Sequence, residues 1–189
     1  MELFVLEKKK IILGIDASIK SSGLAILDGE TGEVIAYDRL PIKTKDFNGD
    51  ENKKIQYIAH TCLELCKAYN VTHISIEDNY IGKHQGTGKT LAKLQGGIIT
   101  LLLENGYNLI YTYSPSQWRK IVTGTGKSKE GAFKWLRKNV IDLGEYNDRD
   151  NKDKNSDLMD SIGIALCLYK KINNICLLYT SPSPRDTER

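Results

Sequence analysis

Four acidic residues that lie far apart in the chain are of the type that binds divalent metal ions. Asp16 ends one apolar run, Glu77 ends a second, and Asp157 and Asp160 lie three residues apart in a later segment. Hard cations such as Mg²⁺ prefer oxygen ligands, and four carboxylates offset the charge of two such ions. Two cations about 4 Å apart can hold an attacking water and a leaving 3′-oxygen in line with a phosphate. The four residues are therefore a candidate site for metal-dependent phosphodiester cleavage.

Each of these carboxylates also has a simpler explanation. Asp16 could cap a turn, Glu77 could lie in water at an exposed strand end, and Asp157 could complement the dipole of a helix. Asp160 is explained least well in this way, because its neighbours on the expected helix are apolar. A carboxylate at the tip of a mostly buried strand is costly unless it is paired or holds a cation. We therefore favour the metal site.

Strands and helices that alternate along the chain would position these side chains. Runs of β-branched and aliphatic residues predict strands, and apolar residues at helical spacing predict helices. The strands are expected at 10–16, 24–27, 34–37, 72–77 and 109–113, and the helices at 51–69, 90–105, 127–140 and 155–169. This order predicts an α/β fold, a five-stranded mixed sheet flanked by helices. Because ligands bind at the carboxyl ends of strands in such sheets, Asp16 and Glu77 should lie at one edge.

The positive charge of the chain is clustered rather than general. The formal net charge of the 189 residues is only +3, so affinity for DNA must come from local groups of cations. Such groups would contact phosphates, which position DNA without reading its sequence. The candidates are Lys83, Lys89, Lys93, Arg119, Lys120, Lys127 and Lys129.

Two segments look like parts of a nucleotide-binding loop but are incomplete. Gly86–Thr90 and Gly124–Ser128 each contain Gly-Lys followed by Thr or Ser. The phosphate-binding loop needs another glycine five residues before the glycine of Gly-Lys, where this chain has Lys83 and Ile121. We interpret both segments as basic turns and expect no nucleotide cofactor.

The remaining composition is typical of an intracellular protein. Cys62, Cys66 and Cys167 are expected to be free thiols in a reducing cytosol. We expect no signal peptide, because the charged start leads directly into a strand. The apolar segment Leu91–Leu103 is too short, and too interrupted by polar residues and glycines, to span a membrane.

The last residues of the chain differ in character from the rest. Cys176–Asp186 is what a transposase-type sequencing adapter encodes when it is translated, and the composition turns abruptly rich in Ser and Pro. We expect residues 175–189 not to be native and residues 1–174 to form a single domain. The alternative is a native disordered tail.

Several motifs, in order, resemble those of the RuvC-type Holliday junction resolvases. They are Gly14-Ile-Asp16, Ser22-Gly-Leu-Ala-Ile26, Glu77, Gly124-Thr-Gly126 and Asp157-x-x-Asp160, and they extend over about Ile11 to Tyr169. Ser114-Pro-Ser-Gln-Trp-Arg119 is similar to a segment of the phage and Gram-positive variants. The resemblance implies a ribonuclease H-like fold and a homodimer that makes paired, symmetric, magnesium-dependent nicks in a four-way DNA junction.

The resemblance also implies roles for individual residues. Asp16, Glu77, Asp157 and Asp160 would be the ligands of two Mg²⁺, for which Mn²⁺ is expected to substitute, and either Lys127 or Lys129 would be the catalytic lysine. Tyr80 would stack on a base at the junction centre, unless it packs on its own domain. The helix around Leu91–Leu103 would form the dimer interface, unless it is an ordinary core helix.

Other functions remain as alternatives. A nuclease with looser choice among branched DNAs has the same motifs. An actin-like or sugar-kinase nucleotide-binding fold begins with a similar Gly-Ile-Asp turn, but it needs a second domain for which this chain has no room. A junction-binding protein without catalysis is disfavoured, because a surface that binds polyanionic DNA gains nothing from four carboxylates that hold no metal.

Overall fold

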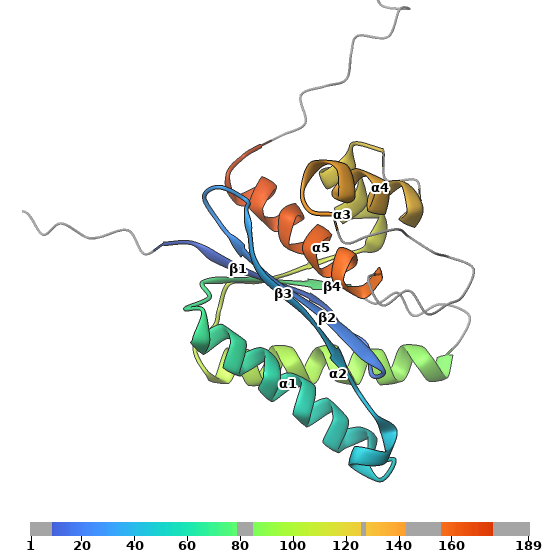
Figure 1. Ribbon diagram of the computed structural model, residues 1–189. Helices are drawn as coiled ribbons and strands as arrows, with labels where there is room; N and C mark the ends of the chain where they lie inside the picture. The colour runs from blue at the N-terminus through green and yellow to red at the C-terminus, as the bar shows by residue number, and fades with distance from the viewer. Residues whose placement is uncertain (1–8, 79–84, 126–127, 143–155, 176–189) are drawn as a thin grey trace, which may run out of the picture.

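A five-stranded mixed sheet forms the centre of the molecule (Figure 1). The structure is a computed structural model that describes residues 9–78, 85–125, 128–142 and 156–175. The strand order is β3-β2-β1-β4-β5, with β1 antiparallel to β2, β2 antiparallel to β3, and β4 parallel to both β1 and β5. The strands are β1 (Ile11–Asp16), β2 (Ser21–Asp28), β3 (Val34–Pro41), β4 (His73–Glu77) and β5 (Ile110–Tyr113). The predicted mixed sheet is confirmed.

Helices cover both faces of this sheet, as Figure 1 shows. Helices α1 (Glu51–Ala68) and α2 (Gln85–Glu104) pack on one face, after a short 3₁₀ helix, η1 (Thr44–Phe47). Helices α3 (Pro115–Thr123), α4 (Lys129–Asn139) and α5 (Ser156–Ile172) pack on the other. None of the described helices combines the length and apolar character that crossing a bilayer requires.

Two apolar cores result from the alternation of side chains along the strands. Ile11, Leu13 and Ile15 of β1 belong to the core under α1 and α2, whereas Ile12 belongs to the core under α3, α4 and α5. Since Asp16 is an even number of residues from Ile12, its side chain leaves the sheet on the α5 side. The end of β1 therefore offers a carboxylate to α5 rather than to α1.

Helix α5 is the central element of the second core. Its residues from Met159 to Leu168 are all buried, because the helix lies between the sheet and the pair α3 and α4. A helix that is buried on every side needs apolar residues all round, and this segment is apolar apart from Asp160 and Ser161. A carboxylate in such a helix is thus enclosed by the fold itself.

Two expectations about the helices were incomplete or wrong. Helix α3 was not predicted, although its sequence carries a helix-start signal: Ser114 caps it in a capping box with Gln117, and a proline follows Ser114. Gly86–Thr90 was interpreted as a turn, but α2 already begins at Gln85. Its first turns are held by α1, because the Thr90 hydroxyl donates to a carboxylate oxygen of Glu51 at 2.9 Å. Tertiary packing thus outweighs the low helix propensity of glycine.

The other element boundaries agree with the predictions to within a few residues. Helix α4 begins at Lys129 rather than at 127, because Ser128 caps it by accepting a hydrogen bond from the backbone N–H of Gly131. The three cysteines expected to be free, Cys62, Cys66 and Cys167, are unpaired and buried. Of the segment expected not to be native, all but Ile175 lies outside the described residues.

Candidate active site

Asp16 and Glu77 meet at the carboxyl ends of neighbouring parallel strands. Ile15 of β1 is paired with Ile76 of β4, so the next residue in each strand is one of these carboxylates. Both side chains lie on the α5 side of the sheet, because Ser75, two residues before Glu77, donates from its hydroxyl to the Ile164 carbonyl of α5 at 3.1 Å. The strand register therefore brings the two acids together as predicted.

Two glycines of the sheet let α5 approach closely enough to complete the site. A Cβ atom on Gly14 would lie 2.7 Å from the Cβ of Ala165 and closer still to the carbonyl oxygen of Ser161. A Cβ atom on Gly23 of β2 would collide with the backbone of Asp157. Any side chain at these two positions would push the helix away. The first turns of α5, which carry the other two acids, thus rest directly on the strands.

Burial and mutual repulsion raise the pKa values of Asp16 and Glu77 in this cluster. Burial raises the pKa of Asp16 well above its ordinary value, and the charges of Asp160, Glu77 and Asp157 raise it further. Burial, followed by the charge of Asp160, likewise raises the pKa of Glu77. These shifts have the causes expected of carboxylates that share one desolvated site. Asp16 is therefore within electrostatic reach of the other three acids.

Lys129 supplies a cation to the same cluster. Its Nζ lies 2.5 Å from Oδ2 of Asp160, a residue that is only 5% exposed. Burial lowers the pKa of Lys129, but the charges of Asp160, Asp16 and Glu77 outweigh this effect and raise it. The structure thus brings Lys129, one of the two candidate lysines, to the carboxylates, while Lys127 lies outside the described residues.

Helix α3 contributes Trp118 and Arg119 to the site. The indole nitrogen of the wholly buried Trp118 donates to Oε1 of Glu77 at 2.9 Å. The Arg119 guanidinium lies over the Trp118 ring, 5.2 Å from its centroid, and its charge acts to lower the pKa of Glu77 and of Asp160. The Nε atom of Arg119 is buried without a hydrogen-bond partner. Arg119 was predicted as a DNA contact, whereas Trp118 was missed.

The chemistry of the donor set fits a hard divalent cation. Its donors are carboxylate oxygens, and their repulsion in a buried setting is what a cation would relieve. In the structure three of the acids have other partners: Asp160 contacts Lys129, Glu77 accepts from Trp118, and Asp157 lies 3.8 Å from Nε of Arg39. No three acidic, histidine or cysteine side chains among the described residues form a ready-made coordination shell.

The other predicted DNA contacts are distributed around the molecule. Lys120 is exposed on α3 beside Arg119, and Lys89 is exposed on α2. Lys93 is directed toward α1, where its Nζ lies 3.3 Å from Oε1 of Glu51. Tyr80 and Lys83 lie outside the described residues. Of the candidate lysines and predicted DNA contacts that the structure describes, Lys129 and Arg119 are the ones whose charges act on Glu77 and Asp160.

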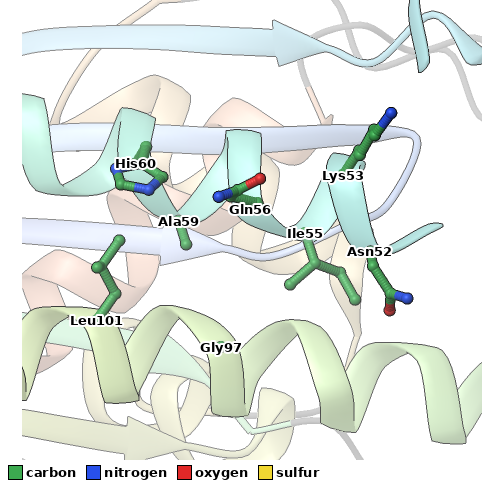
Figure 2. Close-up of a pocket in the computed structure, with 8 residues that line it drawn as sticks. All are labelled: Asn52, Lys53, Ile55, Gln56, Ala59, His60, Gly97 and Leu101. Carbon is green, nitrogen blue, oxygen red and sulfur yellow. The ribbon is translucent and has the colours of Figure 1, made fainter. Parts of the chain in front are cut away.

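A groove of about 440 Å³ lies between α1 and α2 (Figure 2). It is lined by Ile55, Gln56, Ala59 and His60 of α1 and by Leu101 of α2, among others, and its lining includes no acidic residue. Because α1 and α2 pack on the face of the sheet opposite α5, this groove is separate from the carboxylate cluster.

The fold is that of the ribonuclease H-like nucleases, as comparison with solved structures shows. The structure titled T. thermophilus RuvC in complex with Holliday junction substrate matches with a TM-score of 0.70 at 17% identity, over 88% of this chain and 98% of that one. The yeast mitochondrial Holliday junction resolvase Ydc2 matches with a TM-score of 0.57 at 17% identity, over 89% of this chain and 83% of that one. The predicted fold class is confirmed.

The family follows from the sequence. The model of the family described as crossover junction endodeoxyribonuclease RuvC matches residues 12–168, so the chain belongs to the RuvC family, whose nucleases use divalent metal ions. The RuvC protein of Caldicellulosiruptor saccharolyticus is 27% identical over 162 residues, 82% of this chain and 90% of its own length. That of Clostridioides difficile is 23% identical over 171 residues, 87% of this chain and 96% of its own length.

Proposed function

We propose that this protein cuts four-way DNA junctions by metal-dependent hydrolysis, with Asp16, Glu77, Asp157 and Asp160 as the ligands of two Mg²⁺. The observation that carries this proposal is the convergence of these acids from β1, β4 and α5 on one edge of the sheet. Burial there raises the pKa of Asp16, and the charges of the other three acids raise it further. A fold selected for stability alone gains nothing from such a cluster.

The cations of the site would act on the phosphate of the DNA. When bound, the divalent ions would supply Lewis acidity and an activated water. Lys129 is partly buried beside the acids, where its ammonium can bind a phosphate oxygen and stabilise the charge that develops there. Arg119, with its buried and unpartnered Nε, can donate to the same backbone. Both contacts hold the DNA without reading bases, which agrees with selection of a junction by shape.

We also propose that the protein acts as a homodimer, since symmetric paired nicks need two active sites. Helix α2 offers a surface for this: Leu103 is 46% exposed, and a Cβ atom on Gly96 would meet open space. The groove of Figure 2 runs beside it and includes Gly97 and Leu101. The unpaired state of the described cysteines and the bacterial source of the relatives support action in a bacterial cytosol.

The direct test is cleavage of a labelled synthetic four-way junction beside a matched linear duplex, in Mg²⁺ or EDTA. We expect paired symmetric nicks in the junction alone, and none in EDTA. The Asp160→Asn variant should bind the junction without cutting it, whereas Asp46→Asn, at an exposed position in η1, should behave as wild type. Equal cutting of flaps and duplexes would remove the junction specificity, and tight binding without cutting in Mg²⁺ or Mn²⁺ would favour the non-catalytic alternative.

A further inference from the structure

Trp118 connects two parts of the candidate ligand set. It lies in α3, is wholly buried, and donates its indole N–H to Oε1 of Glu77, at the end of β4. The opposite side of its ring rests on α5, where a Cβ atom on Gly163 would lie 2.9 Å from ring carbon Cε3 and closer to Cζ3. The ring therefore fills the space between the helix that carries Asp160 and the strand that carries Glu77.

The chemistry of indole suits a supporting role. Its nitrogen is a donor with no acceptor capacity, so it can bind one lone pair of the carboxylate while the second oxygen stays available to another partner. A ring packed on all sides has one rotamer, so the direction of the donated hydrogen is fixed. Removing a residue that hydrogen-bonds to a metal ligand typically lowers metal affinity or activity by about 10- to 100-fold.

We propose that Trp118 is a positioning residue, which holds Oε1 of Glu77 so that the remaining oxygen faces the metal site. This inference rests on the proposed function, because it takes Glu77 to be a metal ligand. Because the same ring packs on Gly163, it also sets how far β4 lies from α5. One side chain thus aligns a ligand from the sheet with the ligands from the helix.

The Trp118→Phe variant removes the hydrogen bond together with part of the packing. Phenylalanine keeps an aromatic ring at this position but lacks both the N–H and the outer benzo carbons that contact Gly163. The matched control is Trp135→Phe, which changes the other tryptophan, a half-buried residue of α4 whose ring lies 5.1 Å from the ammonium of Lys170. Benzothienylalanine at position 118 is a second variant, because it keeps the bicyclic shape and places sulfur where the N–H was.

Three readouts are taken on the full chain. Mg²⁺ binding without DNA is measured by calorimetry, and kcat and KM are measured on the four-way junction. The indole N–H resonance of Trp118, assigned by its loss in Trp118→Phe, is followed by NMR in the metal-free protein. We expect that signal to shift in Glu77→Gln. We expect Mg²⁺ binding and kcat to fall by about 10- to 100-fold in both Trp118 variants, with KM unchanged, and neither to change in Trp135→Phe.

The outcomes distinguish the positioning role of Trp118 from the proposed nuclease function. If the wild type cuts junctions but Trp118→Phe and the benzothienylalanine variant match Trp135→Phe, the positioning role is refuted while the proposed function stands. If benzothienylalanine restores the activity that Trp118→Phe loses, packing rather than the N–H is responsible, and the inference is again refuted. A wild type that neither binds Mg²⁺ nor cuts refutes the proposed function and this inference with it.

Discussion

Replacing Gly14 with alanine is expected to slow cleavage strongly by moving α5, without altering any candidate catalytic residue. Gly14 lies in the middle of β1, directly beneath α5. The added methyl group would lie 2.7 Å from the Cβ of Ala165 and 3.0 Å from its backbone nitrogen. The neighbours include helix backbone, so no side chain can rotate away to make room. The helix has to withdraw from the sheet.

The size of that withdrawal can be estimated from the contact. Carbon atoms pack at about 3.5 Å or more, so the helix must retreat by about 0.8 Å at Ala165, and the carbonyl of Ser161, which is nearer still, makes this a lower bound. Catalytic groups tolerate about 0.5 Å of displacement, and a misplacement of about 1 Å can cost about 100-fold in rate. Overpacking of this kind also lowers the free energy of unfolding by about 1–3 kcal/mol.

The assay compares single-turnover cleavage of the four-way junction at saturating Mg²⁺ with stability in urea. We expect the Gly14→Ala rate to fall by about 100-fold, with junction binding retained. Ile58→Val in α1 is the control, because Ile58 is fully buried in the opposite core and its truncation costs about 0.5–1.5 kcal/mol without touching α5. A Gly14→Ala protein with wild-type rate and stability would refute the reasoning, as would an equal loss of rate in Ile58→Val.

Three further predictions concern charge. Asp160→Asn should reduce cleavage to background while junction binding persists, measured by nicking and by gel shift. Asp16→Asn should raise the free energy of unfolding of the metal-free protein at pH 7, since it removes a buried carboxylate that its neighbours repel. The variant should also lose the stabilisation by Mg²⁺, which in wild type is about 2.7 kcal/mol when the Mg²⁺ concentration is 100 times the dissociation constant. Asp28 should contribute to acid unfolding. Lys9 and the backbone N–H groups of Thr31 and Glu30 lower the pKa of its carboxyl group to about 2, below the value of about 3.9 in the unfolded chain. The stabilisation that the Asp28 carboxylate gives to the folded protein is therefore complete above pH 4 or so and is lost as the pH falls toward 2.

Each of these has an outcome that contradicts it. Loss of junction binding in Asp160→Asn would indicate a folding role for this carboxylate. A metal-free Asp16→Asn protein less stable than wild type would show that repulsion in the cluster is unimportant. For Asp28, thermal unfolding midpoints are recorded between pH 5 and pH 2, and an Asp28→Asn variant whose profile runs parallel to that of wild type would remove Asp28 as the cause.

The site was largely predictable where local sequence determines the position of a side chain. Asp16 and Glu77 each follow a short buried run, and a carboxylate after such a run lies at the carboxyl end of its strand. The helix that carries Asp157 and Asp160 was evident from its apolar spacing. The family resemblance then assembled these residues into one set. The chain's membership of the RuvC family confirms that resemblance.

The missed features depend on contacts between distant segments. The role of Trp118 becomes visible only when α3 is placed between β4 and α5. Its helix could have been found from the capping box at Ser114, but no local signal indicates where an indole N–H points. In the same way, the sequence left Lys127 and Lys129 as equal candidates, and the approach of Lys129 to Asp160 follows from where α4 packs.

By itself, the sequence predicted the five strands, the helices other than α3, the class of fold and four candidate acids, because these depend on residue type, periodicity and spacing along one segment at a time. Only the tertiary structure decided how closely the acids approach, which cations neutralise them and which neutral group supports Glu77. The physical reason is that burial and Coulomb energies depend on distances between elements. Those distances are set by the glycine contacts that let α5 rest on the sheet.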